Sequence, residues 1–496
     1  MLENNTFPLI NSSDEGRWSD GITRSDGVHW SDERDWSDQE FYKNSYNAIM
    51  IRLIKKYWCF IIILFIYINT SATDRPNILF ILVDDLGYGD LSCQGAKDLK
   101  TPNIDRLMSE GIRFTNFYAN STVCSPTRAS LMTGRYPDMV GVPGVIRHYP
   151  EGNFGYLSEE AILLPELLKK SGYETALIGK WHLGVESPNL PNDRGFDTFK
   201  GHLAGMMNDY YTHLYFGEIF LRDNKKLINP EGHATELFTN WAIEYLNDKI
   251  SGENPFFLYL AYTAPHDPIQ PPSEWFDLVL NREPGIDSAR AGIVALIEHL
   301  DYNIGEVLTS VKDMGLEKKT VVVFASDNGG SLRFSANNGK LRGGKQDLYE
   351  GGIKVPACMK WPGKIAPGTS TDELILMMDF YPTMANIGNT EYSHVVDGVN
   401  LFPLLNGEKE SLEERYVFWM RREGWAYGGQ IYYAARYQNF KLVQNTPFEQ
   451  YQLFDLQKDP GELYPLSISN EMYEILKGNL REHIQQAGTI PWQKAE

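Results

Sequence analysis

Cysteine is scarce in this chain, with 4 among 496 residues. Cys124 lies in the stretch VCSPTRASLMTGRYP, which begins at Val123. No second thiol or histidine lies close by, so the stretch is not a zinc motif, and a lone cysteine does not indicate a disulfide scaffold. The position of Cys124, two residues before Pro126 and four before Arg128, therefore needs another explanation.

An excess of basic charge is also lacking, since 46 Lys and Arg face 65 Asp and Glu, a formal net charge of -19. This balance argues against nucleic-acid binding as the main role, because phosphate contacts need a basic surface. An acidic exterior also repels anionic substrates at long range. Any anion site in this protein must therefore concentrate its own positive charge.

A long apolar run is missing as well, and the best candidate is YWCFIIILFIYI at residues 57–68. Its length is short of the roughly 20 residues that a membrane-spanning helix requires, so we expect no stable membrane span. Arg52, Lys55 and Lys56 precede the run, and the small residues Thr70 and Ala72 follow it. This order predicts a signal peptide at 50–72 and export to the periplasm or the medium, or to the lysosome or extracellular space of a eukaryote.

Residues 1–49 form a low-complexity acidic segment in which Ser-Asp recurs every six residues from Ser13 to Asp38. We hypothesise that translation starts at Met50 and that the mature protein begins near Thr73. Cleavage would remove Cys59 and leave Cys93, Cys124 and Cys358. Because an oxidising compartment favours an even number of cysteines, one of these three is expected to stay unpaired, and Cys124 is the candidate.

Continuous apolar runs begin at Ile78, Pro255 and Thr320 and alternate with helical patterns, for example from Leu164 and from Ala289. Such runs are typical of strands buried on both faces, so we predict an α/β domain with a mixed, mostly parallel sheet flanked by helices over residues 73–400. Each run ends in polar residues, and sites of such sheets form beyond the carboxyl ends of the strands. The three strand ends are therefore expected to converge.

The sequence pattern changes after about residue 400, where short aromatic-rich strand candidates alternate with polar turns. A final helical pattern places Met472, Leu476, Leu480 and Ile484 on one face. Residues 401–496 are therefore predicted to form a smaller C-terminal antiparallel sheet packed by one helix.

Hard oxygen ligands end two of the predicted strands, namely Asp84 and Asp85 at one and Asp327 and Asn328 at the other. Each pair alone is equally compatible with a helix cap or a turn. Together they offer three carboxylates and one amide oxygen, a set that suits Ca²⁺ or Mg²⁺ better than zinc or copper.

Candidate cationic side chains for an anion site are Lys180, His182, His266 and Lys345. Singly they are ordinary: a solvated lysine, a buried histidine or a surface loop would account for each. Lys180 and His182 are two residues apart, so in an extended segment both would point the same way. With Arg128 the four form a plausible nest for a dianionic tetrahedral group.

Pro126 suits the first turn of a helix that continues to Gly134, which places Cys124 at the helix N-terminus. The helix dipole there favours negative charge, so a thiolate nucleophile is one interpretation. A soft thiolate fits poorly beside a hard cation, however.

Cys-x-Pro-x-Arg followed by LMTGR resembles the signature of the type I sulfatases, a family of alkaline-phosphatase-like fold. The resemblance covers essentially residues 75–490 and includes further blocks in the family's order: PNILFILVDDLGYGD, GKWHLG, APHDP, SDNGG, LRGGKQDLYEGGIKVP and LFDLQKDPGE.

This resemblance implies that a maturation enzyme oxidises Cys124 to formylglycine (3-oxoalanine). It implies one Ca²⁺, with an oxygen of residue 124 completing a ligand set of Asp84, Asp85, Asp327 and Asn328. The resemblance further implies that Arg128 orients residue 124 and that Lys180 and Lys345 bind the sulfate group. His266, with Lys345, is implied to assist the departure of the alcohol. His182 is implied to remove a proton from residue 124.

The implied activity is hydrolysis of a sulfate ester, and the make-up of an exported member favours a sulfated polysaccharide or oligosaccharide. Arg147, His148, Asp209 and Tyr210 are candidate substrate contacts on loops. Two alternatives stay open: a phosphomonoester or phosphonate hydrolase of the same superfamily, and a non-catalytic binder of sulfated glycans if Cys124 is unmodified.

Overall fold

The computed structural model describes residues 43, 46–58, 75–149, 152–250, 252–424 and 427–494, in two units, Met1–Asp74 and Arg75–Glu496. In the first unit, residues 46–58 are helical and exposed. The Ser-Asp segment and residues 59–72 of the predicted signal peptide lie outside the described residues. Among those that are described, no helix is long and apolar enough to cross a membrane.

The centre of the second unit is a set of four adjacent parallel strands in the order β11-β1-β10-β4. They are β11 (Thr320–Ser326), β1 (Asn77–Val83), β10 (Phe256–Ala261) and β4 (Glu174–Lys180). Nearly every residue of these strands is buried, which is why their sequences are unbroken apolar runs instead of alternating patterns.

Further strands extend this sheet on both sides. Beyond β4 lie parallel β5 (Thr198–His202) and antiparallel β8 (Leu221–Asp223) and β9 (Lys226–Leu227). Beyond β11 lie antiparallel β12 (Ala357–Lys360), then β2 (Ile112–Phe114) and β13 (Thr369–Thr371). The predicted mixed, mostly parallel sheet is confirmed.

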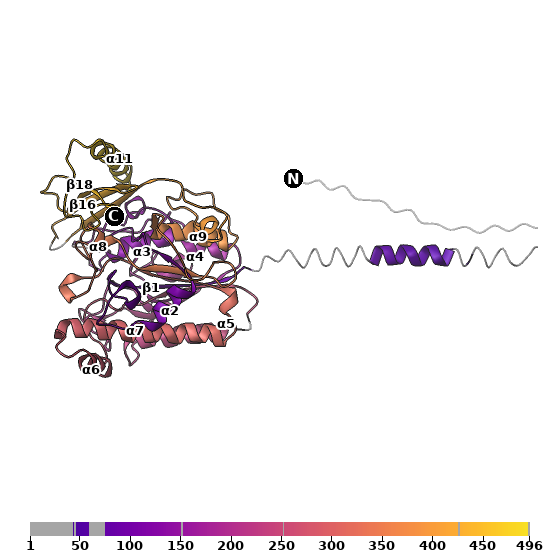
Figure 1. The fold of residues 1–496 in the computed structure, drawn as a ribbon. Coiled ribbons are helices and arrows are strands. Elements are labelled where there is room, and N and C mark those ends of the chain that lie inside the picture. Colours follow the sequence, from indigo (N-terminus) through magenta and orange to yellow (C-terminus); the bar gives the residue numbers. More distant parts are fainter. Residues whose placement is uncertain are drawn as a thin grey trace, which may run out of the picture. The chain divides into compact units, whose positions relative to one another are not determined.

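Helices cover both faces of this sheet (Figure 1). One face packs against α3 (Cys124–Thr133), α4 (Leu164–Lys169) and α9 (Phe380–Ile387), and the other against α2 (Pro102–Glu110), α5 (Ala234–Lys249) and α7 (Ser288–Asp313), on which α6 (Ser273–Arg282) lies. Alternate residues of β1 serve the two cores, since Phe80 belongs to the first and Leu79 and Ile81 to the second.

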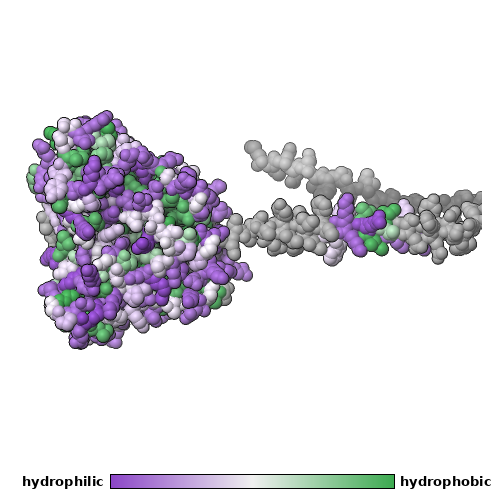
Figure 2. Space-filling view, viewed as in Figure 1, coloured by the Kyte–Doolittle hydropathy of each residue, from purple (hydrophilic) through white to green (hydrophobic). Residues whose placement is uncertain are grey.

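The described part of the second unit also contains short strands and helices. They are the paired strands β3 (Phe117–Tyr118) and β14 (Ile375–Leu376), the hairpin of β6 (Leu214–Tyr215) and β7 (Glu218–Ile219), and the helices α8 (Glu350–Ile353) and α10 (Phe402–Leu405). Hydrophilic side chains cover most of the face of the second unit that Figure 2 shows, with small, scattered apolar patches between them.

The C-terminal part contains the predicted antiparallel sheet, formed by β15 (Tyr416–Glu423), β16 (Gln430–Tyr437), β17 (Phe440–Gln444) and β18 (Gln452–Asp455). The helix α11 (Glu471–Ala487) packs on it through buried Leu476 and Leu480. Both parts of this prediction are confirmed, while the domain boundary at residue 400 stays a prediction.

The cysteines depart from the expectation that only one of three is unpaired. Cys93, Cys124 and Cys358 are all free thiols in the described structure. Cys358 is buried in β12, whereas the Cys93 thiol donates to the sulfur of Met108 at 3.4 Å.

Candidate active site

The carboxyl ends of the four central strands meet at one edge of the sheet, and the three strand ends that the sequence predicts to converge are among them. Asp84 and Asp85 follow β1, Asp327 and Asn328 follow β11, His266 follows β10 by a short loop, and Lys180 ends β4. These side chains are buried, and hydrogen bonds or ion pairs link them across the strand ends. Because adjacent parallel strands all point the same way, residues far apart in sequence become neighbours here.

The acidic groups form a compact oxygen-rich cluster. Asn328 Nδ2 donates to Asp85 Oδ1 at 2.7 Å, and the Asp85 amide donates to Asp327 Oδ1 at 3.2 Å. Asp84, Asp85, Cys124 and His266 each place one potential ligand atom within 4.8 Å of the others. Two buried oxygens, Asn328 Oδ1 and Asp84 Oδ1, accept no hydrogen bond. Buried acceptors without donors fit a cation, and carboxylate and amide oxygens are the ligands that Ca²⁺ takes.

Arg128 lies on α3 and is fully buried. Its Nε and Nη2 donate to Asp327 Oδ2 at 3.0 and 2.7 Å, and Nη1 donates to the carbonyl of Lys180 at 3.2 Å. Arg128 thus connects the helix that begins at Cys124 to the ends of β11 and β4.

The two lysines each pair with one carboxylate of the β1 end. Lys180 Nζ donates to Asp84 Oδ2, and Lys345 Nζ donates to Asp85 Oδ2 at 2.6 Å. Lys345 Nζ also lies 2.9 Å from His266 Nε2, while His266 Nδ1 lies 2.7 Å from the carbonyl of Asp267. Because an ammonium only donates, His266 carries its proton on Nδ1 and accepts at Nε2.

The pKa values of two of the aspartates are shifted in opposite directions. Burial opposes the ionisation of Asp84, but Lys180 and the other nearby cations outweigh it and hold the pKa of Asp84 well below its usual value. Burial and the charge of Asp84 raise the pKa of Asp327 to about 7, although Arg128 opposes them. A divalent cation among these carboxylates would favour the ionised form of both.

Cys124 is the first residue of α3 and is buried. Burial, followed by the charge of Asp84, raises the pKa of the Cys124 thiol far above its usual value. The unmodified side chain is therefore a neutral thiol, which disfavours the interpretation as a plain thiolate nucleophile.

His182 corrects one detail of the sequence analysis. The strand β4 ends at Lys180, and His182 has a φ of 59°, so the segment is not extended as expected. The His182 ring packs on Gly205, where a Cβ would lie 2.3 Å from Nε2. Nε2 lies 3.0 Å from the carbonyl of Ile146 and donates to it, which leaves Nδ1 as a buried acceptor without a hydrogen-bond partner. Burial, with help from Lys180, lowers the pKa of His182 well below its usual value.

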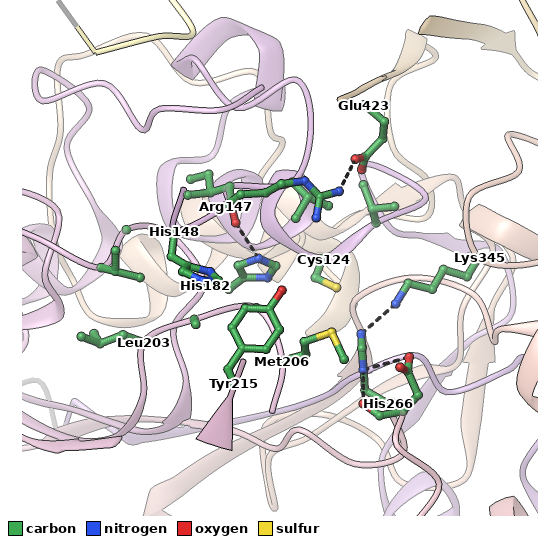
Figure 3. A pocket seen from close by; sticks show the side chains of 18 of the residues that line it. Cys124, Arg147, His148, His182, Leu203, Met206, Tyr215, His266, Lys345 and Glu423 are labelled. Carbon is green, nitrogen blue, oxygen red and sulfur yellow. Dashed lines mark hydrogen bonds and ion pairs between the residues drawn. The ribbon is translucent and has the colours of Figure 1, made fainter. Parts of the chain in front are cut away.

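A pocket of about 180 Å³ opens above this cluster. Figure 3 shows the sulfur of Cys124 pointing into it, with His182 on one side and Lys345 and His266 on the other. Two of the four predicted substrate contacts, Arg147 and His148, line the pocket.

The other two predicted contacts do not line it. The hydroxyl of Tyr210 donates to the carbonyl oxygens of Thr263 and His266, so Tyr210 supports the loop that carries His266. The Asp209 carboxylate accepts from Gln270 and from two backbone amides of its own turn.

Tyr215, Gln346 and Glu423 are among the lining residues that the sequence analysis missed. Glu423 comes from β15 of the C-terminal sheet and pairs with Arg147 at 3.1 Å across the pocket (Figure 3). Nothing in the local sequence around Glu423 signals this position.

The layered fold and the charged cluster at its carboxyl edge define an alkaline-phosphatase-like hydrolase. The Sulfatase family model matches residues 76–389, and the model of the N-sulphoglucosamine sulphohydrolase C-terminal region matches residues 344–489. This chain belongs to the sulfatase family, and it is a sulfuric ester hydrolase.

Relatives and solved structures agree. The chain is 31% identical to N-acetylgalactosamine-6-sulfatase of Mus musculus over 474 residues, covering 85% of this chain and 88% of that protein. It is 34% identical to arylsulfatase A of Homo sapiens, covering 79% and 83%. The crystal structure of Ps i-CgsB in complex with k-i-k-neocarrahexaose superposes with a TM-score of 0.77 at 29% identity, covering 85% of this chain and 95% of that one.

Proposed function

We propose that this enzyme removes sulfate from an alcohol ester of a sulfated polysaccharide or oligosaccharide, with a formylglycine derived from Cys124 and one bound Ca²⁺. The observation that carries the proposal is the position of Cys124, whose sulfur faces the pocket where the carboxylates and cations converge. The names of relatives support a carbohydrate substrate, since N-acetylgalactosamine-6-sulfatase acts on a sugar sulfate and Ps i-CgsB was solved with an oligosaccharide.

The residues that would hold Ca²⁺ are Asp84, Asp85, Asp327 and Asn328, together with an oxygen of modified residue 124. When bound, the ion would offset negative charge on the sulfate oxygens. The buried Asn328 Oδ1 that accepts no hydrogen bond supports this ligand set.

Formylglycine would supply the nucleophilic oxygen that a neutral buried thiol lacks. A formylglycine-generating enzyme is therefore the implied maturation partner. Arg128 would orient residue 124 from the same helix, because its guanidinium is fixed by Asp327 and the carbonyl of Lys180.

The remaining roles follow from donor and acceptor positions. Lys180 and Lys345 would bind sulfate oxygens with charge-assisted hydrogen bonds. His266 with Lys345 would pass a proton toward the leaving alcohol, since the two side chains share a 2.9 Å contact. His182 would accept a proton from residue 124 at Nδ1, which is unprotonated and has no hydrogen-bond partner.

The test combines sulfate release with mass spectrometry. Defined sulfated oligosaccharides are incubated with the enzyme, and the peptide containing residue 124 is weighed. We expect released sulfate and the mass of an aldehyde at residue 124, and we expect Cys124→Ala to lose activity but keep the fold. Cys358→Ala is the matched control, because Cys358 is buried in β12 away from the pocket.

Two results would contradict the proposal. Faster hydrolysis of an aryl phosphate than of the matched aryl sulfate would indicate a phosphoesterase. An intact thiol at residue 124 together with glycan binding and no sulfate release would indicate a binder.

A further inference from the structure

Arg421 on β15 is a buried cation to which the proposed function gives no role. It is 2% exposed, yet among the described residues its guanidinium finds a hydrogen-bond acceptor through Nη1 alone. The Nε and Nη2 donors have none, and the carboxylate of Glu423 lies 3.9 Å from Nε. A buried arginine normally binds several acceptors, because its charge is costly to remove from water without them. The burial of Arg421 therefore needs an explanation other than stability.

The group that Arg421 binds lies next to the active site. Its Nη1 donates to the backbone carbonyl of Gln346 at 2.8 Å. Gln346 directly follows Lys345, whose ammonium pairs with Asp85 and contacts His266 (Figure 3). A residue of the C-terminal sheet thus reaches the backbone beside a lysine of the pocket.

The backbone of Lys345 and Gln346 is held from three sides. The Lys345 amide donates to the carbonyl of Gly330, beyond the end of β11, at 3.0 Å. The Gln346 amide donates to the carbonyl of Thr122, just before α3, at 3.0 Å. Arg421 makes the third contact, from β15. Together these hydrogen bonds fix the peptide units from which the Lys345 side chain extends.

The conformation of Gln346 shows why the third contact matters. Its φ is 81°, in the left-handed region that residues with a side chain rarely occupy. Such a conformation persists where the surrounding contacts over-determine it. The carbonyl that Arg421 binds belongs to this residue, so without the guanidinium Gln346 can relax toward an ordinary φ. A rotation there would displace Lys345, the residue before it.

The guanidinium of Arg421 is itself held in place by aromatic rings. Its Cζ lies 4.6 Å from the centre of the Tyr427 ring and 5.0 Å from that of Tyr432 on β16. Cation–π contacts of this kind attract the guanidinium without occupying its N–H donors. The rings therefore fix the planar group while Nη1 stays available for the carbonyl of Gln346.

We propose that Arg421 is a positioning residue, which holds Lys345 in place in the pocket through the carbonyl of Gln346. Arg421 is not among the residues that line the pocket, so it acts on the reaction only through Lys345. The inference rests on the proposed function, which assigns Lys345 to sulfate binding and, with His266, to the departure of the alcohol.

The test compares two aryl sulfates that differ in leaving group, phenyl sulfate and 4-nitrophenyl sulfate. The poorer leaving group, phenol, depends more on assistance from Lys345 and His266. Arg421→Met keeps an unbranched side chain but has no donor for the carbonyl. We expect it to lower the ratio of kcat/KM for phenyl sulfate to kcat/KM for 4-nitrophenyl sulfate by about fivefold or more. If Arg421→Met does not fold, Arg421→Gln takes its place, because glutamine is polar and ends well short of the position of Nη1.

The matched control is Arg422→Met, at the next residue of β15. The guanidinium of Arg422 also packs on rings, 4.5 Å from Trp492 and 5.1 Å from Phe154, but Arg422 does not line the pocket. We expect Arg422→Met to leave the ratio unchanged. A general loosening of the C-terminal sheet would instead lower the ratio in both variants, and this result would overturn the proposal.

A double variant shows whether Arg421 acts through Lys345. In the Lys345→Ala background, Arg421→Met should change kcat/KM by less than about twofold, because the side chain that it positions is gone. A further loss as large as in the wild-type background overturns the positioning role.

The remaining outcomes separate this proposal from the proposed function. An unchanged leaving-group ratio in Arg421→Met, with Lys345→Ala impaired, overturns the positioning role and leaves the proposed function intact. Wild-type activity in Lys345→Ala overturns the role that the proposed function gives to Lys345, and the positioning role with it.

Discussion

At the scale of single residues, the active site depends on buried charges that pair with one another. Arg128 has no exposed surface, and its partners are Asp327, Asp84 at 3.6 Å, the carbonyl of Lys180 and the hydroxyl of Tyr259. Removing one member of such a set leaves an uncompensated charge out of contact with water, which costs far more than the pair itself contributes. The shape of the Arg128 side chain also matters, because its planar guanidinium group donates to a carboxylate and to a carbonyl at the same time.

We therefore expect Arg128→Lys to be severe even though it conserves charge. A lysine cannot make the two hydrogen bonds to Asp327 and the one to the carbonyl of Lys180 together. The kcat/KM on an aryl sulfate should fall by about 100-fold or more, and the free energy of unfolding by about 3 kcal/mol, measured by kinetics and by urea unfolding. Arg135→Lys is the control, because Arg135 pairs with Asp397 outside the pocket. Wild-type activity in Arg128→Lys would contradict the role of Arg128.

At the scale of elements, three of the four central strands were predicted, whereas β4 and the short strands were not. The runs from Ile78, Pro255 and Thr320 became β1, β10 and β11 because strands buried on both faces must be apolar throughout. The strands β2, β12 and β13 have three or four residues each, too few to show a period. The left-handed backbone of His182 was also not predicted, and neither was the packing of its ring on Gly205, which lies in a different segment.

The C-terminal sheet is joined to the catalytic part by a buried ion cluster. Lys441 on β17 is fully buried and lies 2.9 Å from Glu350 Oε1 of α8 and 2.8 Å from Glu462 Oε1. The hydroxyl of Tyr118 on β3 donates to the other oxygen of Glu350 at 2.6 Å. Although burial opposes it, Lys441 and Arg436 lower the pKa of Glu350 to about 2, so this carboxylate is charged.

We expect Lys441→Met to destabilise the protein by about 3–5 kcal/mol, because two buried carboxylates lose their shared cation. The free energy of unfolding in urea measures the loss. The double variant Lys441→Met with Glu462→Gln should recover part of it, since one of the two orphaned charges is then neutral. Equal stability of Lys441→Met and wild type would show that the cluster does not stabilise the junction.

At the scale of the whole molecule, the site residues at the ends of the central strands could be predicted from the sequence. The residues that reach the site through the packing of the C-terminal sheet could not. Asp84, Asp327, Lys180 and His266 lie at or just beyond the ends of adjacent parallel strands, so topology alone brings them together. Glu423 reaches the pocket only because the C-terminal sheet packs against it, and no local pattern encodes that contact. The same limit explains why Tyr210 was misassigned, because its position on a loop did not reveal that its hydroxyl faces the backbone of Thr263 and His266.

The proposed Ca²⁺ site links the chemistry to the stability of the entire second unit. Its oxygens follow β1 and β11, two neighbouring strands at the centre of the sheet, so the site exists only while the sheet is folded. A ligand that binds only the folded state stabilises it, by about 2.7 kcal/mol when its free concentration is 100 times Kd.

We expect EDTA to lower the melting temperature by several degrees and Ca²⁺ to restore it, measured by calorimetry. Asp327→Asn should abolish this Ca²⁺-dependent shift, whereas Asp313→Asn, at an exposed aspartate at the end of α7, should retain it. A melting temperature that responds to neither EDTA nor Ca²⁺ would mean that the carboxylates are balanced by Arg128, Lys180 and Lys345 alone, because these cations already pair with all three aspartates.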